Sequence, residues 1–301
     1  MNILVAGFIT IDSIQLPMRL ITSVGGPPSY AGLLCARFGH SVTPLTKVGS
    51  DFPDEQSVWL ARNGMVLRGS DRSTTKPTTR FTIANGGGER SLHLASRCED
   101  LSATQIVSER RYNAALVSPV AGEVSQSLLA EISSRSDFTF LDPQGFVRTF
   151  DAGGKVSYAP VEDRNILSRV DAVKMDTVEA EMLTGRSNPR AALEKVSAIG
   201  IRKAIVTQGG EACHVLDGAR IYKVEVPKSQ VIDATGAGDI LSGATVCWYL
   251  KTRDFLRSAC FGIAAAALSL HMIALAKVDL PMSVDEGAQR LYTTASPVAA
   301  L

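Results

Sequence analysis

The sequence predicts an α/β protein built around a doubly wound, mainly parallel sheet that lies between two layers of helices. Short apolar segments with the composition of buried strands alternate along the chain with longer segments that have the apolar spacing of helices. Repeated strand–helix–strand order of this kind predicts parallel strands with helices on both faces. A length of 301 residues would suit two domains, but it suits one large α/β domain over 1–301 equally well.

The expected elements follow from apolar runs and from the residues that interrupt them. A turn is expected near Pro17 and a loop at 25–28, because Gly and Pro stop regular structure. Strands are expected at 3–14, 41–48, 114–117, 138–141, 172–174 and 203–207. Helices are expected at 29–38, 52–63, 123–133, 178–183 and 189–199.

Two β-hairpins are also expected. Residues 78–83 and 90–94 alternate in polarity on either side of a turn at 85–88, and their polar face suits a hairpin that stands partly clear of the core. A second hairpin is expected from 212–216 and 220–224, which Asp217 and Gly218 join.

The uncharged segment 259–276 is just long enough to cross a membrane. It is rich in alanine and contains Gly262, Ser269 and His271, and no aromatic belt flanks it. It therefore predicts a buried core helix. The small apolar tail after Thr294 is expected to fray.

Composition narrows the partners and the compartment. The chain has 31 Lys and Arg residues against 30 Asp and Glu residues, a net charge of +1, which argues against nucleic acid or a membrane surface as the main partner. Its five cysteines include no CxxC pair, so we expect reduced, buried thiols. The N-terminus resembles a strand and lacks the basic region of a signal peptide, so we expect a cytoplasmic protein.

Several catalytic signatures are absent. The sequence contains no GxxxxGK[ST] phosphate loop, no HExxH metal motif and no GxSxG nucleophile turn. A dehydrogenase would need a GxGxxG fingerprint after the first strand, and none is present there.

The most informative segment is 231–244. Gly236-Ala237-Gly238 forms a small-residue turn before a helix, where backbone N–H groups and the helix dipole favour a phosphate group. Asp239 follows in the first turn of that helix, where a carboxylate can accept the proton of a substrate hydroxyl. An N-terminal cap with glycines for packing is the simpler structural interpretation of the same residues.

This segment, from Asp233 to Asp239 with Ser242-Gly243, resembles the C-terminal signature of the ribokinase-like (PfkB) carbohydrate kinase family. Other matches to the family follow in the same order along the chain. They are Asp12, Gly25-Gly26, the VGxD turn at 48–51, the 174–185 stretch that corresponds to NxxE, and 207–210.

The resemblance implies a ribokinase-like fold with a small β lid from about 9–16 and 78–94, and it implies roles for individual residues. Asp239 would be the base, and Gly236, Ala237 and Gly238 would form the anion hole.

The resemblance also implies residues that bind the donor, the ions and the acceptor. Asp176 and Glu179 would act at the phosphates, with Glu179 ordering Mg²⁺ through water. Thr207 and Gly209 would lie along ATP, with ADP as the alternative donor. Asp233 and Thr235 would lie near a monovalent-cation site that some members use. Asp12, Gly25 and Gly26 would bind the acceptor.

Departures from the family pattern bear on the acceptor. Asp176 stands where the family often has Asn, and Tyr30 stands where sugar kinases often have Asn after the diglycine. The glycine that the family carries after the alanine-rich helix is not clear around 271–277. Gln144 and Arg148 follow a strand end and suit a polyhydroxylated or partly anionic ligand. Their D-x-Q-x-x-x-R stretch is similar to that of myo-inositol kinases and some archaeal nucleoside kinases.

These features favour a cyclitol of the myo-inositol type as acceptor. Two other classes of acceptor stay open. They are nucleosides, whose base would stack on Tyr30 or Phe81, and other sugars. A non-catalytic ligand sensor on the same fold is the alternative of another class. The lid suits either a monomer or a homodimer.

Overall fold

The computed structural model describes residues 1–16, 19–86, 89–107, 110–161, 164–281 and 283–301. Over these residues the main sheet has nine strands. Its parallel strands, in spatial order, are β4 (Ser41–Leu45), β1 (Asn2–Ala6), β7 (Ala114–Val117), β8 (Thr139–Leu141), β11 (Ala172–Asp176) and β12 (Lys203–Thr207). Antiparallel strands β13 (Cys213–Asp217), β14 (Arg220–Val224) and β15 (Ser296–Ala300) complete the far edge.

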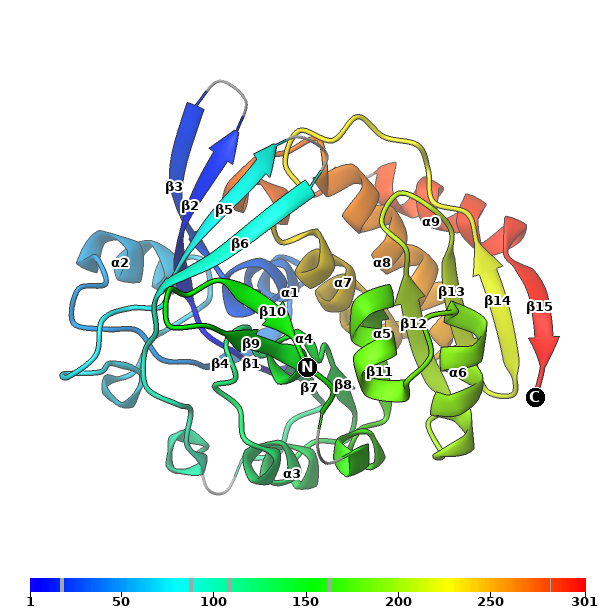
Figure 1. Ribbon diagram of the computed structural model, residues 1–301, viewed down its shortest axis with the longest axis horizontal. Coiled ribbons are helices and arrows are strands. Elements are labelled where there is room, and N and C mark those ends of the chain that lie inside the picture. The colour runs from blue at the N-terminus through cyan, green and yellow to red at the C-terminus, as the bar shows by residue number, and fades with distance from the viewer. Residues whose placement is uncertain (17–18, 87–88, 108–109, 162–163, 282) are drawn as a thin grey trace.

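Helices cover both faces of this sheet, as the alternating pattern predicts (Figure 1). One face packs against α3 (Gln126–Ser134), α5 (Thr177–Thr184) and α6 (Pro189–Ala198). The other packs against α1 (Leu33–Arg37), α7 (Ala237–Thr252), α8 (Phe255–Ser269) and α9 (Ser283–Thr294). A further helix, α2 (Asp54–Arg62), follows β4. The predicted three-layer α/β fold is therefore confirmed.

Strand β1 shows how the layers form. Ile3 and Val5 belong to one buried cluster and Leu4 and Ala6 to another, because successive side chains of a strand point to opposite faces. All four side chains are at most 1% exposed. A continuous apolar run is thus the signature of a strand buried on both faces.

A second, four-stranded sheet stands above the main sheet in Figure 1. Its order is β3 (Arg19–Gly25), β2 (Thr10–Leu16), β5 (Arg80–Gly86) and β6 (Glu89–Ser96). We call it the lid sheet. The predicted strand at 3–14 is wrong, since it is two strands in two sheets, and β3 was not predicted. The turns predicted near Pro17 and at 85–88 include residues 17–18 and 87–88, which lie outside the described residues.

Asp51 attaches the lid sheet to the body. Its carboxylate accepts hydrogen bonds from the backbone N–H of Thr78 at 2.7 Å, from the hydroxyl of Thr78 at 2.8 Å and from Arg80 at 2.7 Å. Burial would raise the pKa of Asp51, but these bonds outweigh it and lower the pKa to about 2. The VGxD turn is therefore fixed to the base of β5.

A short hairpin contacts β5 and β6 of the lid sheet. It consists of β9 (Arg148–Phe150) and β10 (Val156–Tyr158), and it follows the short helix α4 (Gln144–Val147). The Leu94 N–H of β6 donates to the carbonyl of Gly154 at 2.8 Å, and Phe81 contacts the ring of Phe150. The hairpin thus connects the lid sheet to the segment that carries Gln144 and Arg148.

The C-terminal elements differ in part from expectation. The alanine-rich segment is a buried helix, but α8 ends at Ser269, and the predicted continuation to 276 is instead a turn followed by the 3₁₀ segment η5 (Ala274–Val278). The tail expected to fray pairs with β14 as β15. Among the described residues, no helix is both long enough and apolar enough to cross a bilayer.

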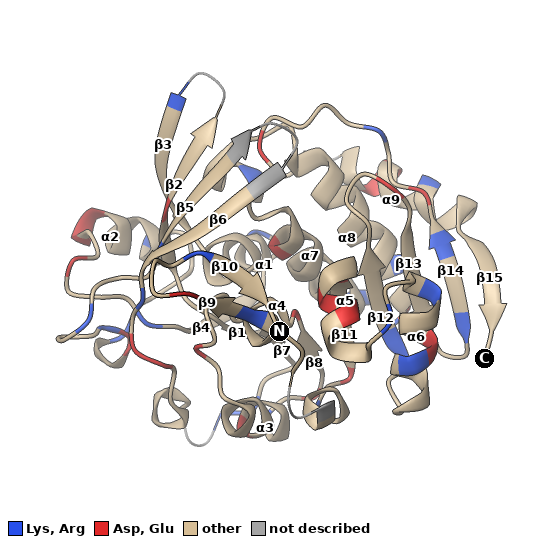
Figure 2. Ribbon diagram, in the orientation of Figure 1, with Lys and Arg blue, Asp and Glu red and all other residues tan. Residues whose placement is uncertain are grey.

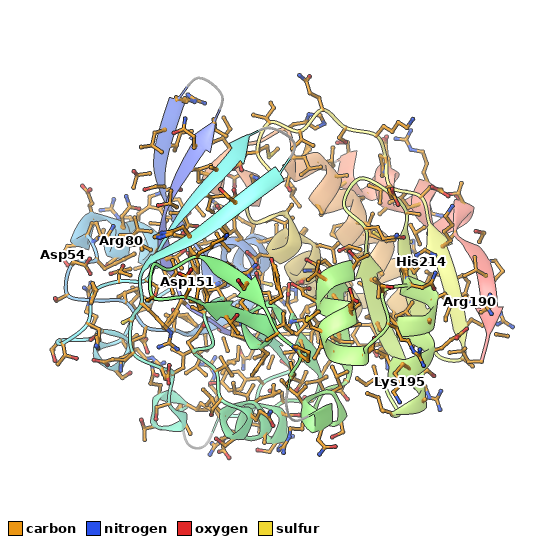
Figure 3. All side chains as sticks on the ribbon, in the orientation of Figure 1. Asp54, Arg80, Asp151, Arg190, Lys195 and His214 are labelled. Carbon is orange, nitrogen blue, oxygen red and sulfur yellow. The ribbon has the colours of Figure 1, made fainter. Side chains whose placement is uncertain are left out.

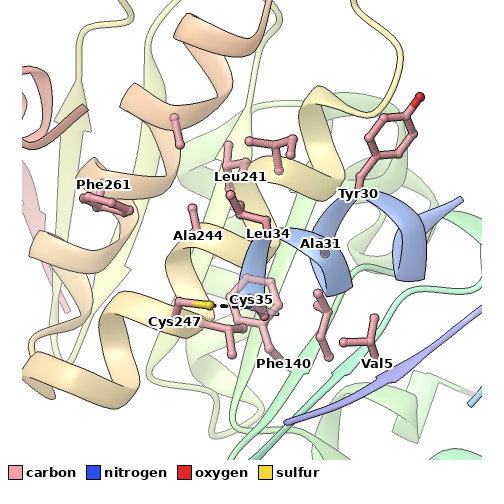
Figure 4. Close-up of a cluster of buried hydrophobic side chains, with 14 of the residues drawn as sticks. Val5, Tyr30, Ala31, Leu34, Cys35, Phe140, Leu241, Ala244, Cys247 and Phe261 are labelled. Atoms are coloured by element: carbon pink, nitrogen blue, oxygen red, sulfur yellow. Dashed lines mark hydrogen bonds between the residues drawn. The ribbon is translucent and has the colours of Figure 1, made fainter. Parts of the chain in front are cut away.

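Buried cysteines and mixed surface charge agree with the composition. Cys35, Cys98, Cys213, Cys247 and Cys260 are all buried free thiols. Figure 4 shows Cys247 beside Cys35 in the core, with 3.0 Å between their sulfur atoms. Acidic and basic residues are interspersed along the chain in Figure 2, and exposed cations such as Arg190 and Lys195 lie on the outside of α6 (Figure 3).

Candidate active site

Two cavities open at the carboxyl ends of the parallel strands, where open α/β sheets bind ligands. The larger has a volume of about 790 Å³ and is lined by residues of β11, β12 and the start of α7. We call it the large cleft. The smaller has a volume of about 50 Å³ and lies under the lid sheet, with Asp12, Phe81 and Ile83 in its wall. We call it the small cavity.

The two cavities share part of their lining. Gln144, Arg148, Gly236 and Asp239 line both of them. A group bound in the large cleft and a group bound in the small cavity would therefore meet at the Asp239 carboxylate.

The turn before α7 gives Asp239 this position. Gly236 has φ +75°, a left-handed conformation that glycine adopts without strain. A Cβ atom at Gly236 would lie 2.6 Å from the ring of Tyr30, so the aromatic ring packs directly on the turn. The helix that follows runs from Ala237 to Thr252, and its first amides point their N–H groups out of the helix end. The turn therefore offers donors and a positive helix end to an anion.

The Asp239 carboxylate is held beside these donors. Asp239 is only 8% exposed, and its Oδ1 atom lies 3.4 Å from the Nε2 donor of Gln144. The same Nε2 atom lies 3.2 Å from the hydroxyl of Ser118 at the end of β7. Gln144, at the start of α4, therefore orients the carboxylate that α7 carries.

A charged cluster forms the floor of the large cleft. The Nζ atom of Lys174, at most 9% exposed, lies 3.0 Å from Asp142 and 3.9 Å from Glu179. Burial lowers the pKa of Lys174, but Asp142, Glu179 and Asp176 more than offset this and raise it above its ordinary value. Lys174 is therefore a permanent cation, and it lies 3.2 Å from where a Cβ of Gly238 would be.

Glu179 lies in the first turn of helix α5 and faces this cluster. Its carboxylate accepts a hydrogen bond from the Asp176 N–H at 2.7 Å, while Asp176 accepts one from the Glu179 N–H at 2.8 Å. This reciprocal capping box fixes both carboxylates at the end of β11. Burial raises the pKa of Glu179 above its ordinary value despite the nearby Lys174. A cation that arrives with a ligand would favour its ionised form.

Some polar atoms in the lining of the small cavity have no hydrogen-bond partner among the described residues. The Thr10 hydroxyl and the Arg148 Nε atom are buried, and neither has a hydrogen-bond partner among the described residues. Arg148 also donates to the Val120 carbonyl at 3.3 Å, which fixes its guanidinium at the cavity wall. Gly25 packs against the Asp12 carboxylate so closely that a Cβ there would lie 1.9 Å from Asp12 Oδ2. The cavity therefore presents donors and acceptors to a ligand with several hydroxyl groups.

A sequence profile of the pfkB family carbohydrate kinases matches residues 12–275, which include both cavities' main residues. The chain belongs to the pfkB family of carbohydrate kinases. It is accordingly a phosphotransferase that acts on an alcohol group.

Two curated relatives and one solved structure illustrate the family likeness. A cytidine kinase of Thermococcus kodakarensis is 25% identical over 84% of this chain and 90% of its own length. An inositol 3-kinase of Zea mays is 28% identical over 74% of this chain, and the match spans 58% of the maize protein. A pyrophosphate-dependent kinase of the ribokinase family, solved with a pyrophosphate analogue and myo-inositol, superposes with a TM-score of 0.79 at 20% identity, over 93% of this chain and 98% of that one. At that identity the structural likeness shows the shared fold.

Most residues predicted from the pfkB resemblance lie around the two cavities. The large cleft is lined by Asp176, Glu179, Thr207, Gly209, Gly236, Ala237, Gly238 and Asp239. The small cavity is lined by Asp12, Gly26, Tyr30, Gln144, Arg148 and Thr235. Gly25 lies behind Asp12, and Asp233 is fully buried behind the turn.

Several residues around the pfkB site were not predicted. Thr10, Ser118 and Asp142 belong to strand ends whose side-chain directions the sequence does not reveal. Lys174 lies in the 174–185 stretch, but its partner Asp142 follows β8, which the sequence does not show to be the neighbour of β11. The lid residues Ile83 and Leu92 follow from the hairpin pattern only once the hairpin is placed over the cavity.

The acidic cluster suits a metal ion that arrives with phosphate groups. Among the described residues, no group of three or more His, Cys, Asp or Glu side chains is arranged to hold an ion. Asp142, Asp176 and Glu179 nevertheless surround a single Lys174, and the Asp142 Oδ1 atom is buried without a partner in the described part of the chain. Mg²⁺ usually keeps several waters and binds through one or two carboxylates together with substrate phosphates. The residues present fit that mode of binding.

Proposed function

We propose that this protein is an ATP-dependent kinase that phosphorylates a hydroxyl group of a small polyol, a cyclitol of the myo-inositol type. The observation that carries the proposal is that Asp239 and Gly236 line both cavities at once. A donor in the large cleft and an acceptor in the small cavity would then have their reacting groups on either side of one carboxylate.

The lining of the large cleft supports a nucleotide as donor. Its volume of about 790 Å³ is in the range of small-molecule sites. Its lining includes Lys174 and the turn before α7, which suit phosphates, and also Val226, Pro227 and Leu270, which suit an apolar base. Pyrophosphate would leave these apolar residues without a ligand, so ATP is the better fit. The experiment described below also tests ADP and pyrophosphate as phosphoryl donors.

The proposed mechanism assigns a role to each group at the junction. Asp239 accepts the proton of the acceptor hydroxyl as that oxygen attacks the γ-phosphorus and the bond to the leaving ADP oxygen breaks. The amides of the Gly236-Ala237-Gly238 turn and the Lys174 ammonium stabilise the negative charge on the transferred group. Gln144 keeps the carboxylate oriented toward the acceptor. Glu179 and Asp176 would hold Mg²⁺ through its waters, and the bound ion would neutralise phosphate charge.

The small cavity supports a compact, hydroxyl-rich acceptor. Its volume of about 50 Å³ holds only a few water molecules, so the lid sheet has to open to admit an acceptor. The lid residues Phe81, Ile83 and Leu92 then form an apolar cover that excludes water from the reacting groups. The Nε–H group of Arg148 and the hydroxyl of Thr10, which have no partner among the described residues, supply donors and an acceptor. A cyclitol ring would satisfy them with its hydroxyl groups.

A nucleoside is the second candidate. It is favoured by the aromatic rings of Tyr30 and Phe81 in the cavity wall and by the cytidine kinase relative. A nucleoside is larger than a cyclitol, so it would require the lid sheet to open further.

The test is a panel of acceptors and donors with purified protein and Mg²⁺. Phosphorylation of myo-inositol, cytidine, adenosine, ribose and fructose is measured with ATP, ADP and pyrophosphate in turn. We expect myo-inositol with ATP to give the highest kcat/KM, and each hydrogen bond worth about 1.4 kcal/mol that an acceptor cannot make should lower it tenfold. Preference for cytidine or adenosine would contradict the cyclitol proposal. Tight acceptor binding without turnover of any donor would instead indicate a ligand sensor.

A further inference from the structure

A buried lysine lies directly behind the turn that carries the anion-binding amides. Lys277, in η5, has no exposed surface. Its Nζ atom donates to the backbone carbonyl of Asp233 at 2.6 Å and to that of Thr235 at 2.7 Å, and it lies 3.2 Å from Asp233 Oδ2. An ammonium group has three N–H donors, so these oxygens are enough to satisfy it.

This set of oxygen atoms has the chemistry of a monovalent-cation site. Some kinases of the pfkB family use a monovalent cation, and Asp233 and Thr235 are the residues for which the sequence resemblance predicts one. Here the Lys277 ammonium already contacts both carbonyls and the carboxylate. A free K⁺ ion cannot approach the same oxygens while Nζ is in place, so the residues present do not fit an exchangeable cation.

The carbonyls that Lys277 holds belong to the peptides that lead into the turn. A trans peptide is planar, with its C=O and N–H on opposite sides. No cis peptide occurs among the described residues, so carbonyls that point toward Lys277 direct the N–H groups of Ala234 and Gly236 away from it. Ala234 and Gly236 both line the large cleft. Lys277 thereby fixes which way the turn's donors face.

We propose that Lys277 is a positioning residue that supplies, within the chain, the positive charge for which other members of the family use a monovalent cation. The kinase reaction of this protein therefore needs no added K⁺. This inference rests on the proposed transfer at Asp239, but it is independent of which acceptor is used.

Other contacts support a built-in cation. Asp233 is fully buried; burial would raise the pKa of its carboxyl, but Lys277 and the N–H groups of Thr235 and Ala274 outweigh burial and lower it. The Ala274 N–H lies 3.2 Å from Asp233 Oδ2, and Ala274 has the left-handed φ of +51°. The segment η5 also packs on β3 and on the π-helical turn η1 (Pro28–Gly32), which carry Gly25 and Tyr30. Lys277 therefore joins the phosphate-binding turn to the acceptor side of the site.

The experiment compares the wild type with Lys277→Met in buffers whose only monovalent cation is tetramethylammonium, with KCl or NH₄Cl added at constant ionic strength. We expect the wild-type kcat to change less than twofold on adding K⁺. Loss of the ordered turn should lower kcat of Lys277→Met by about 10²–10³-fold, as for the loss of an oxyanion-hole donor. Added K⁺ or NH₄⁺ should restore part of that loss in a saturable way. Lys251→Met, which removes an exposed lysine of α7, serves as the control and should behave as the wild type.

A second readout does not depend on turnover. The midpoint of thermal unfolding of Lys277→Met should rise with K⁺ but not with tetramethylammonium, whereas that of the wild type should not respond to K⁺. Wild-type activity that requires K⁺ would overturn the proposal, even if Lys277→Met does not fold. Full activity of Lys277→Met without K⁺ or NH₄⁺ would also overturn it. Absence of wild-type activity in every salt would count against the proposed function instead.

Discussion

Asp239→Asn should lower kcat for phosphoryl transfer by about 10²–10⁴-fold, the usual contribution of a proton-transfer group. Asparagine has nearly the same shape and can keep the contact with Gln144, but it cannot take a proton from the acceptor hydroxyl. The KM for ATP should change little, because the anion-binding amides and Lys174 remain. Steady-state rates of ADP formation, measured with and without the acceptor, test this expectation.

The matched control for this variant is Asp285→Asn. Asp285 also lies in the first turn of a helix, α9, but it is exposed and lines neither cavity. The change from carboxylate to amide at a helix N-terminus should cost a few tenths of a kcal/mol up to about 1 kcal/mol of stability in either variant. Only Asp239→Asn should lose activity. An Asp239→Asn enzyme that keeps most of its kcat would show that another group accepts the proton.

Gly236→Ala should lower kcat by about 10²–10³-fold, comparable to the loss of an oxyanion-hole donor. The added methyl group would lie 2.6 Å from the Tyr30 ring, so the turn or the ring must move. Either shift displaces the amides that face the donor, and a shift of Tyr30 also changes the small cavity that it lines. Both kcat and the KM for the acceptor should therefore change.

Gly218→Ala separates this effect from simple backbone strain. Gly218 also has a left-handed conformation, φ +64°, but it lies in the β13–β14 turn, where a Cβ would meet no atom within 4 Å. Both variants should lose about 1–2 kcal/mol of stability, because an L-residue is strained in that conformation. Urea unfolding measures that loss for each. Equal, small losses of activity in the two variants would argue against a specific role for the Gly236 turn.

Local chemistry made much of the fold and site predictable from sequence. The turn at Gly236 and the carboxylate at Asp239 are close in sequence, and a helix end has the same donors wherever it occurs. The alternation of apolar strands and helices likewise reveals the layered sheet, because strands buried on both faces lack polar residues.

Features that depend on contacts between distant segments were not predictable in this way. The break between β1 and β2 lies inside one continuous apolar run, because both strands are buried although they belong to different sheets. The Lys174–Asp142 pair depends on β11 lying next to β8. Nothing in the sequence distinguishes Lys277 from an exposed lysine near the end of the chain. Its full burial depends on the path of η5 behind the turn.

The central claim is that Asp239 stands between a donor and an acceptor that bind in two adjoining cavities. A crystal structure of the protein with Mg²⁺, a non-hydrolysable ATP analogue and myo-inositol tests it most directly. The account predicts the analogue's phosphates at the Gly236-Ala237-Gly238 turn and one acceptor hydroxyl at about 2.6–3.2 Å from the Asp239 carboxylate. It would be contradicted by an acceptor bound outside the small cavity, or by a phosphate chain bound away from the start of α7.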